Sequence, residues 1–248
     1  MSGHSKWSTI KRKKAVVDAA RGKVFTRVAK ELTIAARSGG GDEAANPRLR
    51  TAMATARAAN MPMVNVERAI KKGTGELEGV IIEEIVYEGY GPGGVALMME
   101  VATDNRNRTV SEIRHLLSKH GGNLATTGSV AWMFDTKGVI QINSDGIDED
   151  ELMMIALEAG AEDLVNEGEY FEIITGPTDL NTVNEAILAA DFGIEAAQIQ
   201  HIPNNFTEVS ADDLPAVVTL MEILDDYDDM QKLSASVNFT DEMLEGLE

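Results

Sequence analysis

The stretch that organises this chain is residues 3–38, GHSKWSTIKRKKAVVDAARGKVFTRVAKELTIAARS, which is strongly basic within a strongly acidic protein. From about Arg21 onward, apolar residues recur at helical spacing, which predicts an amphipathic helix. The run before it, which contains Trp7, has no apolar face, and we interpret it as an arm. The predicted apolar stripe of the helix comprises Val17, Val24, Val28, Leu32 and Ala35.

Charge is segregated along the 248 residues, whose formal net charge is −19. Residues 1–80 contain 16 Lys and Arg against 7 Asp and Glu, a net charge of +9, whereas residues 81–248 contain 6 against 34, a net charge of −28. A basic domain can bind phosphates even when the whole protein is acidic. Two interpretations are open: the basic part binds nucleic acid, or it complements the acidic part within the fold.

Composition limits the class of protein. The length favours two or three domains, and an apolar content of 44% is typical of a globular protein. The chain contains no run of about 18 apolar residues, so we predict no membrane span. The basic N-terminus lacks the apolar segment of a secretion signal. The absence of cysteine excludes disulfides and thiolate chemistry. We expect a cytoplasmic protein.

Residues 1–78 are predicted to be helical. Glycines 39–41 end the first helix, and Asn46-Pro47 begins the second as N-cap and first helical residue. A third short helix contains Val66, Ala69 and Ile70, and we expect Gly73 to end it. The predicted apolar face of the second helix is Leu49, Ala52, Met53 and Ala56.

Strand periodicity begins after residue 79. Residues 81–88 and 95–101 flank a glycine-rich turn and predict a hairpin. That turn lacks GxxxxGK[ST] and no helix follows it directly, so we do not interpret it as a phosphate cradle. The sequence Thr109-Val110-Ser111-Glu112 fits a capping box and predicts a helix start. A short strand is expected over 129–134.

Residues 137–203 have the element order βαββαβ, with helices over 148–159 and 180–190, which is the ferredoxin-like pattern. A helix over 211–226, a strand over 234–239 and a short helix from Asp241 follow. The predicted fold class is α+β: an N-terminal three-helix domain plus two α/β-sandwich domains, at least one ferredoxin-like, the second inserted into the first. The predicted domains are 1–78, 79–135 plus 205–248, and 136–204.

No catalytic or metal-ligating pattern stands out. His115 and His120 are five residues apart, which places them on different helix faces, and no HExxH motif is present. The segment 143–151, NSDGIDEDE, lacks the terminal Glu of an EF-hand loop. We interpret the acidic cluster at 225–229 as a solvated helix end, with adventitious divalent binding as the alternative. The sequence therefore predicts no cofactor, no metal and no enzymatic activity.

Several motifs resemble a known family. GHSKW, IKRKKA and DAARGKVFT are followed by NPRLR, RAIKKG, YEGYGPGG, TDNRNRT and GSVAWMF, in that order. Together they resemble the YebC family, which includes probable transcriptional regulators and the mitochondrial translational activator of cytochrome oxidase. The resemblance implies DNA-binding control of transcription, and the translational relatives imply binding to ribosomal RNA on the ribosome. Ala125 stands where relatives tend to have Gly, which affects the expected geometry of that loop.

We predict that Lys and Arg of the arm and helical domain contact phosphates, with counterion release driving affinity. Trp7 either stacks on an unpaired base or anchors the arm. Arg106 and Arg108 either lie in a polar loop that presents them to a phosphate or a partner, or belong to a solvated connection in which Asp104 offsets one of them. A basic protein partner would suit the acidic domains, and a remote alternative is an enzyme acting in an acidic interdomain cleft. The predicted contacts are His4, Lys6, Trp7, Lys11, Arg12, Lys13, Lys14, Arg21, Lys23, Arg27, Lys30, Arg48 and Arg50.

Overall fold

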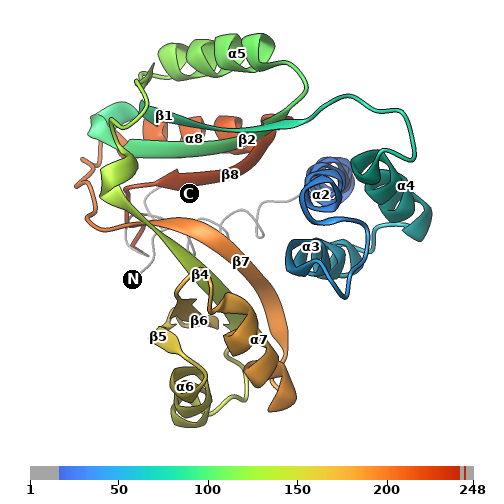
Figure 1. Ribbon diagram of the computed structural model, residues 1–248. Coiled ribbons are helices and arrows are strands. Elements are labelled where there is room, and N and C mark those ends of the chain that lie inside the picture. Colours follow the sequence, from blue (N-terminus) through green and yellow to red (C-terminus); the bar gives the residue numbers. More distant parts are fainter. Residues whose placement is uncertain (1–16, 241–242, 244–248) are drawn as a thin grey trace.

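The structure is a computed structural model that describes residues 17–240 and Met243, with side chains from Gly22 onward (Figure 1). The predicted contacts of the arm, from His4 to Lys14, and the side chain of Arg21 lie outside the described residues. So does most of the short helix expected from Asp241.

Three helices form the helical domain: α2 (Val17–Gly39), α3 (Pro47–Ala58) and α4 (Met63–Thr74). Asn46 caps α3, since its side chain accepts a hydrogen bond from the Leu49 backbone N–H at 3.1 Å. Val24 belongs to the predicted stripe but is 42% exposed, so the buried part of α2 begins one turn later. The core of the helical domain comprises Val28, Leu32, Ala35, Leu49, Ala52, Met53, Ala56, Val66 and Ala69.

Gly73 does not end α4, contrary to our expectation. The helix continues to Thr74, and Gly75 follows it in the left-handed conformation with φ of 83°. A Cβ at Gly73 would lie 2.4 Å from the Thr33 carbonyl oxygen and 2.7 Å from the Ala36 Cβ. The glycine therefore allows α4 to approach the backbone of α2 more closely than any side chain would permit.

The first sheet contains β1 (Glu83–Tyr90), β2 (Ala96–Thr103), β3 (Asn123–Leu124) and β8 (Met230–Ala235), in the order β3-β1-β2-β8. All its pairings are antiparallel, and β1 and β2 form the predicted hairpin. Helices α5 (Arg106–Lys119) and α8 (Leu214–Asp225) bury apolar side chains in one core with β2 and β8.

Several local predictions in this region are wrong. Helix α5 begins at Arg106 with Asn105 as its N-cap, so the supposed capping box lies inside the helix, where Thr109 is fully buried. The expected strand over 129–134 is a loop and a 3₁₀ turn (η2, Ala131–Met133), and β3 supplies the strand instead. The strand β8 begins four residues earlier than predicted, because the chain turns directly out of α8.

The second sheet contains β4 (Phe134–Asn143), β5 (Ala161–Asn166), β6 (Tyr170–Thr175) and β7 (Ile194–Pro203). Its order, β5-β6-β4-β7, is antiparallel and ferredoxin-like. Helices α6 (Glu149–Glu158) and α7 (Leu180–Ala189) share its apolar core. Because all these elements lie between β3 and β8 in sequence, the second sandwich is inserted into the first, and the predicted fold class is confirmed.

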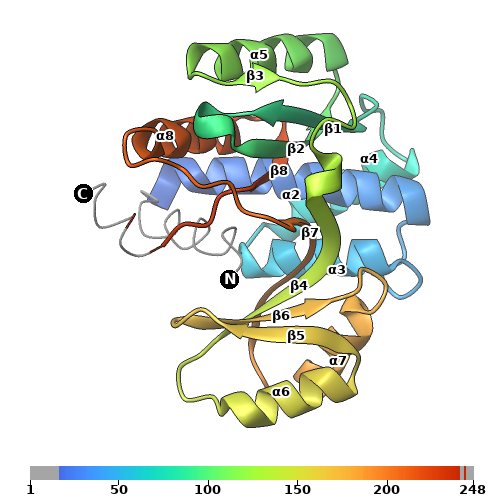
Figure 2. The same ribbon diagram turned by 90° about the vertical axis from the view of Figure 1, so that its left-hand side faces the viewer.

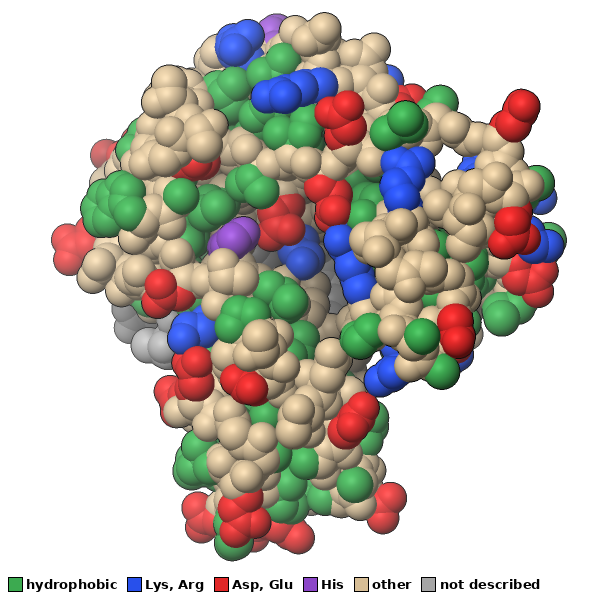
Figure 3. All heavy atoms as spheres, viewed as in Figure 1, with side chains coloured by type: hydrophobic (Ala, Val, Ile, Leu, Met, Phe, Trp, Pro, Cys, Tyr) green, Lys and Arg blue, Asp and Glu red, His purple; other side chains and the backbone are tan. Residues whose placement is uncertain are grey.

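The helical domain contacts the first sandwich through α2 and the inserted sandwich through α3. Figure 1 shows the helical domain beside the two sandwiches, and Figure 2 shows α2 running alongside α8 and β8. On the face shown in Figure 3, Lys and Arg side chains gather along the inner side of the helical domain and over α5, with many acidic side chains on the inserted sandwich. Within the described residues, no helix combines the length and apolar character needed to cross a bilayer.

The close approach at Gly73 predicts a stability effect. Gly73→Ala should lower the free energy of unfolding by about 1–3 kcal/mol, since the new methyl group overpacks the contact between α4 and α2. Gly22→Ala is the matched control: it lies in α2 with open space around its Cβ position and should stabilise the protein by about 0.5–1 kcal/mol. Urea denaturation measures both. Equal effects of the two substitutions would contradict the packing argument.

Candidate nucleic-acid interface

The basic face of α2 meets the acidic segment that follows α8. Residues 225–229 contain four aspartates in five positions, and successive turns of α2 bring a cation opposite three of them. These contacts join the helical domain to the first sandwich across almost 200 residues of sequence. The ion pairs are Lys23 Nζ to Asp226 Oδ2 at 3.0 Å, Arg27 Nη1 to Asp225 Oδ1 at 3.2 Å, and Lys30 Nζ to Asp229 Oδ1 at 2.7 Å.

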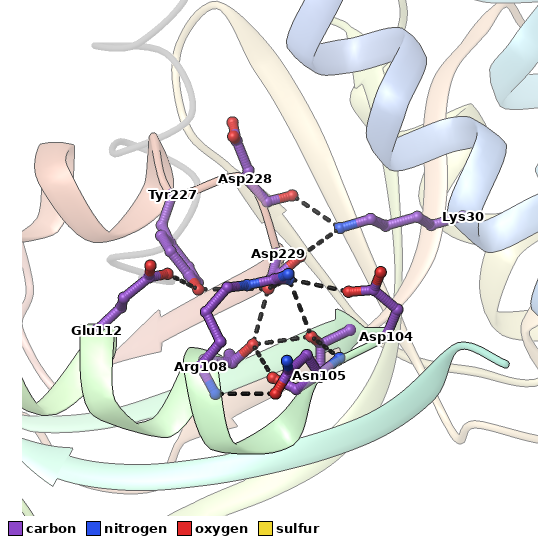
Figure 4. A network of polar contacts seen from close by, with 10 residues as sticks. Lys30, Asp104, Asn105, Arg108, Glu112, Tyr227, Asp228 and Asp229 are labelled. Atoms are coloured by element: carbon purple, nitrogen blue, oxygen red, sulfur yellow. Dashed lines mark hydrogen bonds and ion pairs between the residues drawn. The ribbon is translucent and has the colours of Figure 1, made fainter. Parts of the chain in front are cut away.

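Asp229 is the centre of this contact, and its side chain is only 7% exposed (Figure 4). One carboxylate oxygen accepts from Lys30, and the other accepts from Arg108 Nη2 at 2.9 Å and Thr109 Oγ1 at 2.7 Å. Lys30 also donates to the backbone carbonyl of Asp228 at 3.0 Å. One carboxylate therefore connects α2, α5 and the start of β8.

Burial and hydrogen-bond partners shift the pKa values of Asp229 and Tyr227 in this network. Burial alone would raise the pKa of Asp229, but hydrogen bonds from Lys30, Arg108 and Thr109 outweigh it, so the pKa lies well below its ordinary value. The pKa of Tyr227 is raised by burial and by the hydrogen bond that its hydroxyl donates to Glu112 at 2.6 Å. Asp229 is therefore held as the anion and Tyr227 as the neutral phenol.

The predicted contacts on α3 are also ion-paired. Arg48 bonds to Glu31 through Nε at 2.7 Å and to Glu84 through Nη2 at 2.5 Å, so it links α2, α3 and β1. Hydrogen bonds to these two carboxylates raise its pKa above the ordinary value. Arg50 lies 3.5 Å from Glu185 of the inserted sandwich. Of the predicted contacts that are described, each from Lys23 onward has an acidic partner in the fold.

Arg106 and Arg108 lie in the first turn of α5 rather than in a loop before it. Arg108 pairs with Asp104 at 3.0 Å and with Asp229 at 2.9 Å, so it is part of the network described above. Arg106 is exposed and has no ion pair with another described residue. The two arginines therefore differ in role, and Asp104 pairs with one of them, as one of the two interpretations of the sequence expected.

Sequence reasoning missed the cations that remain available on the helical domain. Arg68, Lys71 and Lys72 are exposed on α4, and none forms an ion pair with another described residue. Arg37, at the end of α2, contacts the backbone carbonyl of Ile82 at 3.4 Å. The motif RAIKKG contained the signal, since its three cations fall outside the apolar stripe of α4.

The described residues contain no cluster of three His, Asp or Glu side chains arranged to hold a metal ion. His201 Nε2 lies 3.4 Å from Glu100 Oε1, and Lys232 Nζ lies 3.9 Å from the other oxygen of the same carboxylate.

The fold and surface define a class: a multidomain α+β protein in which a basic helical domain is held by ion pairs against two acidic α/β sandwiches. The chain belongs to the TACO1/YebC family. Residues 5–76 match the model of the TACO1/YebC N-terminal domain, and residues 82–237 match that of the second and third domain.

Relatives cover essentially the whole chain. A probable transcriptional regulatory protein of Desulforapulum autotrophicum is 55% identical over 247 residues, which is 100% of both chains. One from Chlorobaculum parvum is 51% identical and covers 100% of this chain and 99% of its own length. The crystal structure of a conserved hypothetical protein from Aquifex aeolicus superimposes with a TM-score of 0.87 at 45% identity, covering 93% of this chain and 96% of that one.

The Asp229 network predicts a pH-dependent stability. Asp229→Asn should lower the free energy of unfolding by about 3 kcal/mol at pH 7, because Lys30 and Arg108 are then left without their shared anion. The folded pKa of Asp229 is depressed, so its contribution is present above the unfolded value of about 3.9 and is lost as the pH falls through the folded value. The difference from the unmodified protein should therefore shrink below about pH 5.

Asp228→Asn is the matched control. It removes the same charge one residue away, from an exposed side chain, and leaves the backbone carbonyl that accepts from Lys30. Thermal unfolding from pH 7 to pH 3 measures both variants. A pH-independent loss in Asp229→Asn, or an equal loss in Asp228→Asn, would contradict the assignment.

Proposed function

We propose that this protein is a non-enzymatic, nucleic-acid-binding regulator of gene expression that binds through its helical domain. The observation that carries the proposal is the segregation of charge, +9 over residues 1–80 against −28 over residues 81–248. Lys and Arg that contact phosphates release condensed counterions, which supplies affinity without reading sequence. The names of the relatives, probable transcriptional regulatory proteins, support control of transcription.

The ion pairs of α2 and α3 divide the basic residues into two groups. Lys30 and Arg27 contact largely buried carboxylates, so their charge is used within the fold. The exposed cations of α4, namely Arg68, Lys71 and Lys72, are available to phosphates. Lys23 is intermediate: its partner Asp226 is 66% exposed, and a pair so open to solvent is weak enough for a polyanion to displace.

A second candidate is a translational activator that binds ribosomal RNA on the ribosome. The acidic sandwiches favour it, because naked DNA would repel a net charge of −28 whereas basic ribosomal proteins would complement it. Structured RNA can also be bound through shape, phosphates and stacking on unpaired bases, which needs no helix in a major groove. The two candidates share the same cationic surface and differ in the working polymer.

Neutralising cations of α4 and of the predicted arm should weaken binding. Replacing Lys71 and Lys72 by Ala, alone and together with Lys11, Arg12, Lys13 and Lys14, should reduce affinity for duplex DNA. Removing each phosphate contact should flatten the log–log salt dependence by about 0.9. Fluorescence anisotropy of the full chain on labelled duplex measures this.

Melting temperature is the accompanying control, since exposed substitutions such as Lys71→Ala and Lys72→Ala change stability by no more than about 0.5 kcal/mol. Lys137→Ala with Lys232→Ala removes two charges from the sandwiches and should leave the salt slope unchanged. Unaltered affinity in the six-residue variant, or salt-insensitive binding by the unmodified chain, would overturn the proposal.

The working polymer is distinguished by sedimentation of cell lysate on sucrose gradients. Co-migration with ribosomal particles, abolished by neutralising Lys11, Arg12, Lys13 and Lys14, is expected for the translational activator. A protein that stays at the top of the gradient and is found at discrete promoters by chromatin immunoprecipitation is expected for the transcriptional regulator. Absence from both would contradict both candidates.

A further inference from the structure

Residues 105–134 form a segment with more basic than acidic residues within the acidic part of the chain. Of the 34 Asp and Glu over residues 81–248, only Glu112 falls in this segment, whereas four of the six Lys and Arg do. The segment folds into α5, the edge strand β3, the loop after it and η2. An even distribution of acids would place about six here, so the exclusion of carboxylates needs a reason other than composition.

The outer face of α5 displays hydrogen-bond donors. The helix buries Ile113 and Leu117 against the first sheet, and its opposite face is exposed. Glu112 lies at the flank of this face, where its carboxylate accepts from the Tyr227 hydroxyl at 2.6 Å. Figure 3 shows Lys and Arg side chains over α5. The exposed side chains of α5 are Arg106, Asn107, Arg108, Ser111, Glu112, Arg114, His115, Ser118 and Lys119.

Trp132 lies near the C-terminal end of the segment 105–134. It is 70% exposed, the highest exposure among the large hydrophobic residues of the described chain. Its indole Nε1–H donates to the Ser129 carbonyl at 3.0 Å, which fixes the ring relative to its own loop. The segment 121–134 that carries it contains no charged residue. A tryptophan this exposed in an uncharged segment can stack on a planar ring of a binding partner.

The loop that carries Trp132 is built around the buried carboxylate of Glu88. This carboxylate accepts from the backbone N–H groups of Gly128 at 2.6 Å, Val130 at 2.7 Å and Ala131 at 3.0 Å. Burial would raise the pKa of Glu88, but these bonds outweigh it and hold the pKa below its ordinary value. The loop is therefore rigid before any partner arrives, which lowers the entropic cost of binding.

We propose that the outer face of α5 and Trp132 form a second nucleic-acid contact, in which Arg114 and Lys119 bind phosphates and the indole stacks on an unpaired base. This inference rests on the proposed function and extends it to a surface outside the helical domain. Figure 2 shows the chain passing from α5 through β3 at the sheet edge and on to the turn before β4, so both parts of the proposed contact lie next to that edge.

The chemistry favours a single-stranded or looped polymer. Hydroxyl, amide and guanidinium donors such as those of α5 are the groups that contact phosphate and sugar. An indole can stack only on a base that is out of the duplex, and such stacking tolerates any base because each has a π-face. Excluding carboxylates from the segment also removes the repulsion that the rest of the sandwich would exert on phosphates.

Tryptophan fluorescence tests the stacking directly, because the chain has two tryptophans. In the full chain carrying Trp7→Phe, emission comes from Trp132 alone. Titration with oligo(dT) and oligo(U) should quench this emission as binding saturates. Trp132→Leu should weaken binding of these single strands about tenfold, with a smaller effect on blunt duplex DNA.

The phosphate contacts are tested in the same background. Arg114→Ala with Lys119→Ala should flatten the log–log salt dependence on single strands by about 1.4, or about 0.7 per contact. The matched control, Lys137→Ala with Lys232→Ala, removes the same charge from the same part of the chain and should leave the slope unchanged.

The outcomes separate this proposal from the function it extends. Single-strand binding with unchanged Trp132 emission and an unchanged slope in the α5 variant would overturn the second contact and leave the helical domain as the binding site. Failure of the full chain to bind any polynucleotide would overturn both. Quenching by an acidic peptide such as oligo(Glu), and not by oligonucleotides, would assign the surface to a protein partner and also overturn the proposal.

Discussion

One buried carboxylate, that of Asp229, links the helical domain to the first sandwich. It accepts from Lys30 of α2 and from Arg108 and Thr109 of α5, and it lies where the chain leaves α8 for β8. Removing a charge from water is costly, and the cost is offset here because every partner donates to the ionised form. Asp229 therefore contributes, with Asp225, Asp226 and Glu84, to holding the helical domain against the first sandwich, and its side chain is the most buried of the four.

The ion pairs of α2 show that part of the basic stretch is used within the fold. Of two interpretations of the charge segregation, ion pairing within the fold accounts for Lys23, Arg27 and Lys30, which face the aspartates at 225–229. The exposed cations of α4 have no such partners among the described residues. The cations of α2 thus pair with the acidic part, whereas those of α4 stay exposed. Counting charges along the sequence does not distinguish the two helices.

Glu88 serves the same physical purpose at a different place. Its carboxylate gathers three backbone N–H groups of a loop that has no sheet to satisfy them. Buried amides must be paired, so the carboxylate substitutes for a neighbouring strand and fixes the loop. In both cases a buried anion organises chain segments that apolar packing alone leaves undetermined.

The sequence by itself determined the helical domain, the two sandwiches, the insertion of one into the other and the family, because periodicity, caps and motifs are local signals. Tertiary structure decided the rest. Asn105 displaced Thr109 as the start of α5, since Thr109 is needed in the core to donate to Asp229. Gly73 spaces two helices rather than ending one. The partners of Lys23, Arg27 and Lys30 lie about 200 residues away in the sequence. The pattern of one helix does not predict which side chains another segment will place beside it.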